Sequence, residues 1–485
     1  MVEIFIDGER IEADDSHTVM QAARASGHEI PYFCWHPELS VPGNCRVCMV
    51  EIENDVGEAG WLDIACNMPV VKGMRVRTDS ERVRARRKEV LQFLTLNHPV
   101  DCGICDKAGE CKLQDYHYAY NGAASVSHES KVHASKHHLL SERIVLDNER
   151  CILCSRCVRF THEISKSHGL GIQNRGDHSL VRAVEDGAFE RDPYSDNVID
   201  ICPVGALLPV QHLHQARVWY LEPTASICPG CERGCNIDIW HRRADWKLNR
   251  LDPAANARID RVTPRENPAV NGPWTCNKAR DLAKIFGRAR ATAALHRGRV
   301  VGLDEAVERA RVLIAAAQRP VALVSTWASN EELGAFHAAL GHRIDCYVKT
   351  DWLPLPGEPI EDDILIKRDK NPNRAAAEAL YPPLPLDVRA ALGGSDLVIV
   401  WGEGCDFAQL PAAAKVVQLD AWLESQHGAA EVFIPISIQT ERSGHYTNFA
   451  GVVSRFDACF AKPTGVVEAQ LLFAALALSP PVTAS

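Results

Sequence analysis

The chain is rich in cysteine, the residue type best suited to hold iron or zinc. It has eighteen cysteines, and fifteen of them lie in tight groups between Cys34 and Cys276. The N-terminal residues lack the apolar core of a signal peptide, so we expect a reducing compartment, where grouped cysteines bind metal rather than form disulfides. Cys346, Cys405 and Cys459 stand apart, and we expect them to act as small hydrophobic residues.

The first group, Cys34-x10-Cys45-x2-Cys48-x17-Cys66, has three cysteines and a fourth farther on. This layout is typical of a [2Fe–2S] loop, although its first gap is longer than in plant-type ferredoxins. Upstream, residues 2–6 and 9–12 predict a β-hairpin and residues 18–26 predict a helix. That order of elements resembles the small β-grasp ferredoxins. A structural zinc site is the alternative.

The second group, His98-x3-Cys102-x2-Cys105-x5-Cys111, offers three thiolates and one imidazole. A four-iron cluster needs four ligands, and imidazole replaces thiolate at iron in Rieske centres, where it raises the potential. We therefore predict that His98 is the fourth ligand of a [4Fe–4S] cluster. A histidine that caps a helix or meets solvent is the alternative.

The third group, Cys151-x2-Cys154-x2-Cys157 followed by Cys202-Pro203, matches one ligand set of the two-cluster bacterial ferredoxins. None of the positions expected for the second ligand set is a cysteine here: Thr161, Asp192, Ser195 and Val198. One complete set is kept and the other is completely lost. The segment is therefore predicted to be a ferredoxin-like domain with a single [4Fe–4S] cluster.

The fourth group is Cys228-x2-Cys231-x3-Cys235, closed by Cys276. Gly230, between the first two cysteines, would let the backbone approach a cluster closely. A C-x2-C pair is also a zinc signature. After three iron–sulfur groups we favour a further [4Fe–4S] cluster.

Beyond about residue 287 the chain is rich in alanine and valine and has no grouped cysteines. Strands are predicted at 320–326, 396–401, 416–419 and 432–436, and helices at 303–318, 331–340 and 375–380. This alternation predicts a small doubly wound α/β domain. The proline-rich stretch 351–374 predicts irregular surface or interface. Gly402-x-Gly404 is only part of a phosphate-loop pattern and predicts a tight turn.

Composition narrows the classes of protein. The 485 residues are 24% charged and 46% hydrophobic, as in soluble globular proteins. A net charge of −10 gives no indication of nucleic-acid binding. No apolar run approaches the ~18 residues of a membrane helix, so membrane association would go through a partner. No nucleophile–base pair, Walker loop or flavin fingerprint is present, and we predict no catalytic residue.

Four stretches together resemble one family, the large iron–sulfur subunit of respiratory NADH:quinone oxidoreductase (complex I). They are PYFCWHPELSVPGNCRVCMVEI, NHPVDCGICDKAGECKLQDY, RCILCSRCVRF with DICPVGAL, and CPGCERGCNIDIW ending in WTCNKAR. The resemblance covers about the first 285 residues. Residues 369–374 and 441–448 are more weakly similar to the family's molybdopterin-oxidoreductase-like domain. The resemblance implies an electron-transfer subunit that passes single electrons from the flavin subunit along its clusters toward the quinone site.

The resemblance also implies the organisation of the chain, an α+β multidomain protein. Its domains would be a β-grasp [2Fe–2S] domain at 1–80, a [4Fe–4S] domain with one histidine and three cysteine ligands at 81–140, a ferredoxin-like single [4Fe–4S] domain at 141–220, a small [4Fe–4S] domain at 221–287 and a truncated molybdopterin-oxidoreductase-like doubly wound α/β domain at 288–485. One [2Fe–2S] and three [4Fe–4S] clusters are implied, the last off the main path. The implied partners are the flavin/NADH-binding subunit, other peripheral-arm subunits and, indirectly, the membrane arm, on the cytoplasmic face of the plasma membrane.

The chain departs from the family in two places. The spacer before Cys276 is longer, with an apparent insert around 251–260, and only about 200 residues follow that cysteine, so we expect no molybdopterin. Three rivals remain open. They are the electron-transfer subunit of an NAD-linked hydrogenase, which resembles the first 215 residues, a molybdenum enzyme such as formate dehydrogenase, and a structural zinc protein.

Overall fold

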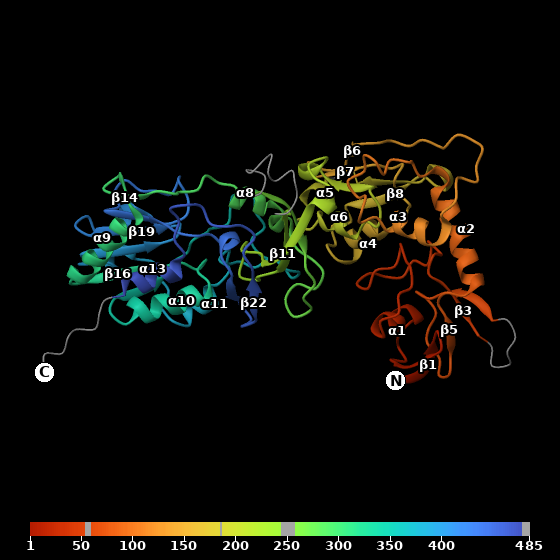
Figure 1. Ribbon diagram of the computed structural model, residues 1–485, viewed down its shortest axis with the longest axis horizontal. Helices are drawn as coiled ribbons and strands as arrows, with labels where there is room; N and C mark the ends of the chain where they lie inside the picture. The colour runs from red at the N-terminus through yellow and green to blue at the C-terminus, as the bar shows by residue number, and fades with distance from the viewer. Residues whose placement is uncertain (54–59, 185–186, 244–257, 478–485) are drawn as a thin grey trace. The chain divides into compact units, whose positions relative to one another are not determined.

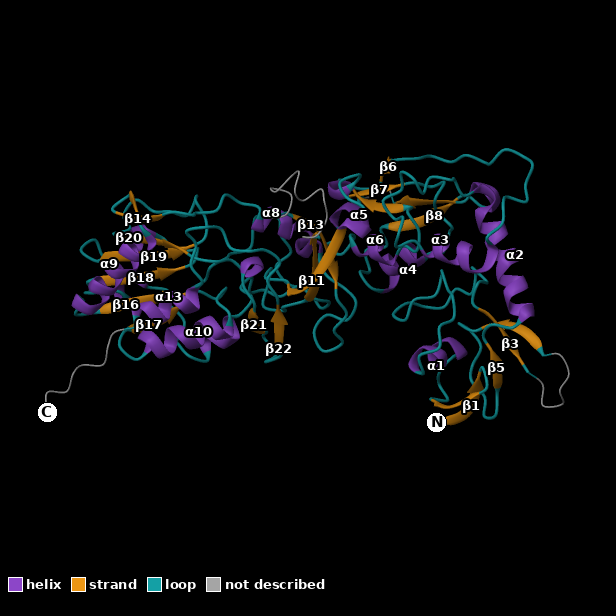
Figure 2. Ribbon diagram, in the orientation of Figure 1, coloured by secondary structure: helices purple, strands orange, loops and turns teal. Residues whose placement is uncertain are grey.

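The computed structural model describes residues 1–53, 60–184, 187–243 and 258–477. The chain divides into two compact units, Met1–Tyr220 and Leu221–Ser485, and each contains both helices and sheets (Figures 1 and 2). Among the helices of these ranges, none combines the length and the hydropathy needed to cross a bilayer.

The first unit begins with a mixed five-stranded sheet in the order β2-β1-β5-β3-β4. Asp7 and Gly8 have φ of 50° and 87°, so they form the tight turn of the predicted hairpin. Thr18 caps the predicted helix with a reciprocal hydrogen bond to Gln21. The elements are β1 (Val2–Ile6), β2 (Glu9–Ala13), α1 (Val19–Ala25), β3 (Met49–Ile52), β4 (Trp61–Ile64) and β5 (Arg75–Arg77).

Helices then lead to the second cysteine group. Helix α2 begins after Ser80, whose hydroxyl accepts from the Val83 amide, and it ends at His98. These helices are α2 (Glu81–Asn97), α3 (Lys112–Tyr116) and the π-helix η1 (His117–Asn121).

Short strands and helices surround the third group. One sheet has the order β10-β7-β6, and β8 pairs with β9. The elements are β6 (His138–Leu139), β7 (Ile144–Leu146), α4 (Arg156–Glu163), β8 (Leu170–Gln173), β9 (Leu180–Ala183), α5 (Ala188–Arg191), α6 (Asn197–Ile201) and β10 (Leu207–Pro209).

The second unit opens with a three-stranded antiparallel sheet that carries the fourth group. Its elements are β11 (Leu221–Ile227), β12 (Asn236–Arg242), β13 (Ile259–Pro264), η6 (Asn277–Asp281) and α8 (Leu282–Phe286). The apparent insert at 251–260 falls mostly outside the described residues.

A seven-stranded sheet follows, in the order β15-β14-β20-β19-β18-β16-β17. Its five strands from β20 to β17 are parallel. The strands are β14 (Ala294–His296), β15 (Arg299–Val301), β16 (Pro320–Val324), β17 (Asp345–Val348), β18 (Leu397–Trp401), β19 (Lys415–Asp420) and β20 (Val432–Pro435). The four strands predicted here are all present.

Alternate strand residues face two separate cores. One core packs against α9 (Leu303–Ala316), α10 (Asn330–Phe336) and α13 (Ala469–Leu476), and the other against residues near α12 (Val388–Ala391). A hairpin of β21 (Gly444–Thr447) and β22 (Val453–Phe456) and the short α11 (Arg374–Glu378) complete the unit.

The stretch 351–373 is irregular, as predicted, but only part of it lies at the surface. Lys370, Asn371 and Asn373 are buried, and Lys370 Nζ donates to three backbone carbonyls at 2.9 Å. The prediction of a surface segment is wrong for this half, because buried side-chain hydrogen bonds replace secondary structure there.

Candidate iron–sulfur centres

The four thiols of the first group converge in the loops beside β3 and β4. Cys34, Cys48 and Cys66 are buried. A hydrogen bond from Cys45 lowers the pKa of Cys34 to about 6, and the same bond, with burial, raises the pKa of Cys45. Cys48 is likewise hydrogen-bonded to Cys66 and feels the charge of Cys34, and its pKa is raised. Four sulfurs in one place is the arrangement a [2Fe–2S] cluster needs.

The second group follows the end of α2. Burial lowers the pKa of His98 to about 4, and its Nδ1 has no hydrogen-bond partner among the described residues. A neutral imidazole with an available nitrogen is the form that binds metal. Burial raises the pKa of Cys105 and of Cys111, and Cys105 interacts electrostatically with both Cys102 and Cys111. This donor set fits an iron–sulfur cluster.

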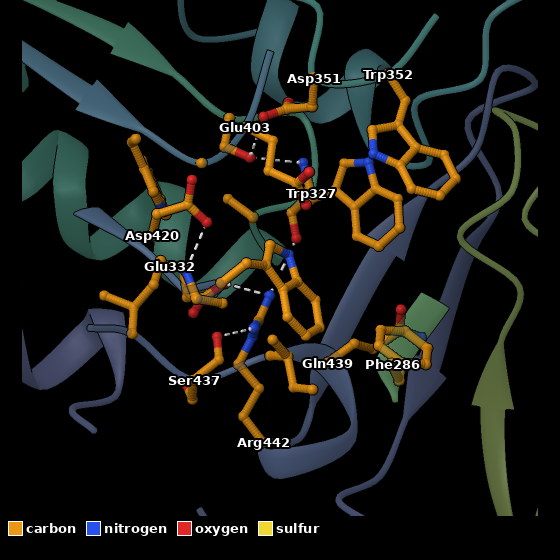
Figure 3. A pocket seen from close by; sticks show the side chains of 18 residues that line it. Phe286, Trp327, Glu332, Asp351, Trp352, Glu403, Asp420, Ser437, Gln439 and Arg442 are labelled. Atoms are coloured by element: carbon orange, nitrogen blue, oxygen red, sulfur yellow. Dashed lines mark hydrogen bonds and ion pairs between the residues drawn. The ribbon is translucent and has the colours of Figure 1, made fainter. Parts of the chain in front are cut away.

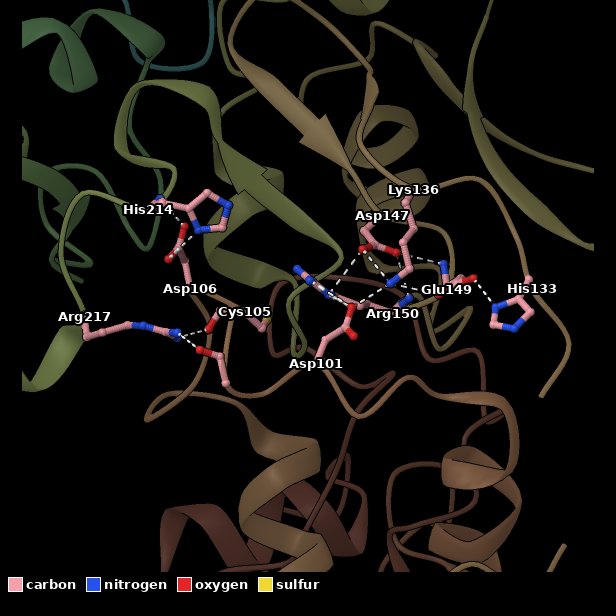
Figure 4. A network of polar contacts seen from close by, with 11 residues as sticks. Asp101, Cys105, Asp106, His133, Lys136, Asp147, Glu149, Arg150, His214 and Arg217 are labelled. Atoms are coloured by element: carbon pink, nitrogen blue, oxygen red, sulfur yellow. Dashed lines mark hydrogen bonds and ion pairs between the residues drawn. The ribbon is translucent and has the colours of Figure 1, made fainter. Parts of the chain in front are cut away.

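Charged side chains hold the loop of the second group in place (Figure 4). The buried Arg150 places Nη2 3.0 Å from Asp101, and Lys136 Nζ lies 2.6 Å from the same carboxylate. The charge of Arg150 favours the deprotonated forms of both Cys105 and His98. Metal ligation requires those deprotonated forms, so Arg150 favours it.

The four cysteines of the third group, Cys151, Cys154, Cys157 and Cys202, line a single cavity of about 370 Å³. Burial raises the pKa of Cys151 to about 12 and that of Cys154 to about 11, and each thiol feels the charge of others in the group. The Leu153 amide donates to Sγ of Cys151 at 3.4 Å. Buried thiols ionise readily only beside positive charge, which a metal cluster supplies.

The positions of the lost second ligand set form part of the interior. Thr161 and Val198 are completely buried. The Asp192 carboxylate accepts from the hydroxyls of Ser165 and Ser167 at 2.6 and 2.7 Å. Packed and hydrogen-bonded side chains thus replace the missing ligands.

The fourth group lies where β11 turns into β12. The amide of Cys228 donates to the carbonyl of Cys235 at 2.8 Å. Burial raises the pKa of both thiols, and it raises that of Cys276 to about 11. Cys231 interacts electrostatically with all three. The Gly230 amide donates to Sγ of Cys228 at 3.4 Å, so the backbone approaches this group closely, as predicted.

The loop of the third group touches the loop of the first. Arg156 and Arg159, both on α4, donate to the carbonyls of Trp35, at 2.6 Å, and of Cys34. Asn44 donates to the carbonyl of Leu153, which lies within the third group. Helix α4 therefore links these two groups directly.

The third group also touches the second. A Cβ on Gly205, three residues after Cys202, would lie 2.1 Å from Sγ of Cys105. The amide of Lys112, next to Cys111, donates to the carbonyl of Pro203 at 3.1 Å. The ligand loops of the first unit are therefore neighbours in the order first, third, second.

Sequence reasoning missed the residues that connect the groups. Arg150, Arg156 and Arg159 all lie within or beside RCILCSRCVRF, so a cation next to each cysteine was visible in the sequence. Gly205 carried no such signal, because its role depends on a contact with a distant loop.

Among the described residues, no three histidine, cysteine or acidic side chains meet closely enough to hold a single metal ion. Ligands to different irons of one cluster need not meet at one point. The sites thus have the features of ferredoxin-type centres, in which cysteines on short loops surround a cluster.

Comparisons with known proteins agree with this class. Residues 1–81 match a 2Fe-2S iron-sulfur cluster binding domain, and residues 87–124 match the NADH-ubiquinone oxidoreductase-G iron-sulfur binding region. Residues 141–208 match the ferredoxin-like domain of NADH-quinone oxidoreductase subunit 3. Ferredoxin-like 2Fe–2S and 4Fe–4S domains are therefore present in a chain of mixed α/β content.

Individual relatives extend the match. The chain is 39% identical over 280 residues to the NADH-quinone oxidoreductase G subunit of Rickettsia prowazekii, which is 58% of this chain and 39% of that one. It is 38% identical over the same length, with 38% of the relative covered, to the NADH-ubiquinone oxidoreductase 75 kDa subunit of Reclinomonas americana. The predicted resemblance is confirmed over this region. The chain spans about two fifths of the length of these relatives.

A solved structure also matches part of the chain. It is titled as an NAD+-reducing [NiFe]-hydrogenase in the H2-reduced state, and the match has 30% identity and a TM-score of 0.38. It covers 45% of this chain and 91% of the other.

Proposed function

We propose that the chain is the iron–sulfur electron-relay subunit of an NADH:quinone oxidoreductase. It would carry one [2Fe–2S] and three [4Fe–4S] clusters on the four ligand sets named above, within the five domains that the sequence predicts. Each cluster takes up and releases one electron at a time. The chain would contribute no bond-breaking residue of its own.

The observation that carries this proposal is the direct contact between successive ligand loops. Helix α4 joins the first group to the third, and Gly205 lies against Cys105 of the second. Electron transfer needs short gaps between centres, and loops in contact provide them. A protein that only stored metal would have no need of this continuity.

The residues around each site would set the potentials. Amides of Leu153 and Gly230 donate to cysteine sulfurs, and such bonds, like burial and ligand type, tune a cluster. Arg150 places a buried positive charge beside the second site. These groups hold charge and geometry while electrons pass, and none has to move a proton.

The proposed partners are the flavin- and NADH-binding subunit and other peripheral-arm subunits. Contact with the membrane arm would be indirect, on the cytoplasmic face of the plasma membrane. The similarity to the G and 75 kDa subunits of other organisms supports this assembly. We expect no molybdopterin in the C-terminal unit.

Affinity purification tests the assembly. The tagged chain would be isolated gently from detergent-solubilised membranes, and its partners identified by mass spectrometry. We expect a flavin-binding NADH subunit together with polytopic membrane subunits. Recovery of only hydrogenase or formate-oxidising subunits would contradict complex I, and one molybdenum per chain would contradict the absence of the cofactor.

The order of the relay has its own test. In the assembled complex, Cys154→Ser should remove the third cluster, so NADH would still reduce the first but would reduce the second slowly in freeze-quench EPR. Cys405→Ser, which alters a cysteine outside the four groups, is the matched control. Undiminished reduction of the second cluster in Cys154→Ser would contradict the proposed order.

A further inference from the structure

A cavity of about 540 Å³ opens at the carboxyl ends of the parallel strands in the second unit (Figure 3). Ser325 follows β16, Gly402 follows β18, Ala421 follows β19 and Ile436 follows β20, and all four line it. This edge of a parallel sheet is where open α/β folds bind ligands. The volume lies within the range of small-molecule pockets.

Aromatic side chains form much of the wall. The rings of Trp327 and Trp352 lie side by side with centroids 5.3 Å apart, and Phe286 meets Trp327 edge-on at 6.4 Å (Figure 3). Trp401 and Trp422 also line the cavity. Flat apolar walls of this kind suit a flat ligand.

Five polar atoms of the lining are buried and have no hydrogen-bond partner among the described residues. Two are donors and two are acceptors, and the fifth is a hydroxyl: Trp327 Nε1, Arg442 Nε, Gln439 Oε1, Asp420 Oδ2 and Ser437 Oγ. Asp420, Ser437 and Gln439 are each only 2% exposed. Buried polar atoms are almost always satisfied in folded proteins, so this cluster indicates a ligand with both donors and acceptors.

The charges of the lining exclude a phosphorylated ligand. Glu332 is paired with Arg442 at 3.0 Å, and Glu403 with Arg288 at 2.6 Å. Asp351 is paired with Lys349. Asp420 adds a further carboxyl, whose pKa burial raises to about 6. Within the described lining, no cation is left over for an anion.

We propose that this cavity binds an uncharged, flat nitrogen heterocycle with neighbouring N–H and C=O groups, of the nucleobase or nucleoside class. Trp327 and Arg442 would donate to its acceptors, and Asp420 and Gln439 would accept from its N–H groups. The site does not depend on the iron–sulfur clusters. It gives the C-terminal unit a binding role that the electron relay does not require.

Binding is tested on the purified full-length chain by calorimetry and tryptophan fluorescence. The probes are guanosine, adenosine, cytidine and uridine, each beside its 5′-monophosphate. We expect at least one nucleoside to bind and its monophosphate to bind at least tenfold more weakly. No heat and no quenching with any nucleoside at millimolar concentration would overturn the proposal and leave the cavity to ordered water.

Two variants test the assigned atoms. The other oxygen of Asp420 accepts the Ala421 amide at 2.5 Å, so Asp420→Asn would turn its NH2 into the cavity and replace an acceptor by a donor. Trp327→Phe removes only the indole N–H. Each should weaken nucleoside binding at least tenfold, because buried partners are left unpaired.

Trp240→Phe is the matched control. The Trp240 indole lies outside the cavity and donates to Thr263 at 2.9 Å, so its loss should leave affinity unchanged. Circular dichroism and thermal unfolding without ligand would verify that each variant is folded. Wild-type affinity in folded Trp327→Phe and Asp420→Asn, or equal binding of nucleoside and monophosphate, would contradict the proposal.

Discussion

At the scale of single residues, His98 has the most distinctive role. It ends α2, it is neutral because of burial, and its Nδ1 is unpartnered among the described residues. These features distinguish it from a histidine that caps a helix through its side chain or meets solvent, the alternatives that the sequence left open.

His98→Cys should lower the potential of the second cluster, because thiolate donates more charge to iron than imidazole does. An EPR-monitored redox titration measures this change. The potentials of the other three clusters serve as internal controls and should stay constant. If the second cluster titrated as in the wild type, His98 would not be its ligand.

Gly205 has a steric role that a single methyl group tests. In Gly205→Ala the new Cβ would fall 2.1 Å from Sγ of Cys105, so we expect the second cluster to be lost or displaced. Iron content and the EPR spectrum measure this effect.

Gly103→Ala is the control for Gly205→Ala, because it lies in the loop of the second group and a Cβ there would meet nothing within 4 Å. It should keep the full signal. A normal cluster in Gly205→Ala would show that the two loops separate without cost.

At the scale of elements, α2 and α4 each present part of a site. Helix α2 brings His98 to the second group, and α4 carries Cys157 and the arginines that reach the first group. Both helices were implied only by position in the sequence, because their apolar faces are small. Helix α2 buries only Val83, Arg87 and Leu91.

The start of α2 depends on its cap. Ser80 accepts from the Val83 amide at 3.3 Å and donates to Glu51 at 2.5 Å. Ser80→Ala should cost about 1 kcal/mol locally, which is about fivefold faster amide exchange in the first turn. Hydrogen-exchange mass spectrometry measures this rate.

Ser130→Ala, at an exposed loop position, is the control for Ser80→Ala and should leave the exchange of α2 unchanged. Unaltered protection of residues 81–85 in Ser80→Ala would mean that packing against the sheet, rather than the cap, holds this end.

At the scale of the whole molecule, the chain forms two compact units that meet in sequence at Tyr220 and Leu221. The first three cysteine groups lie in one unit, and the fourth lies in the other with the nucleobase-type cavity. Each unit has its own hydrophobic core.

A chain ending at Tyr220 should therefore fold and retain the first three cluster signals while losing the fourth. EPR spectroscopy and iron analysis measure this outcome. Full-length Cys228→Ser is the comparison, since it should lose the same signal without removing the unit. Loss of all clusters from the shorter chain would show that the first unit needs the second to fold.

The sequence by itself determined the four cysteine groups, the first hairpin and helix, and the four parallel strands predicted in the C-terminal region. Ligand spacing and alternation are local properties, because a short loop can surround only a small volume and a buried strand needs apolar residues throughout. In the structure, the cysteines of each group do interact with one another.

Only the tertiary structure decided which groups are neighbours and which side chains stand between them. The contact of Gly205 with Cys105 joins loops a hundred residues apart, and the cavity draws its unpartnered atoms from the ends of several strands. Such contacts follow from how complete elements pack, which no local pattern of residues specifies. The burial that gives these atoms their chemical character arises at the same step.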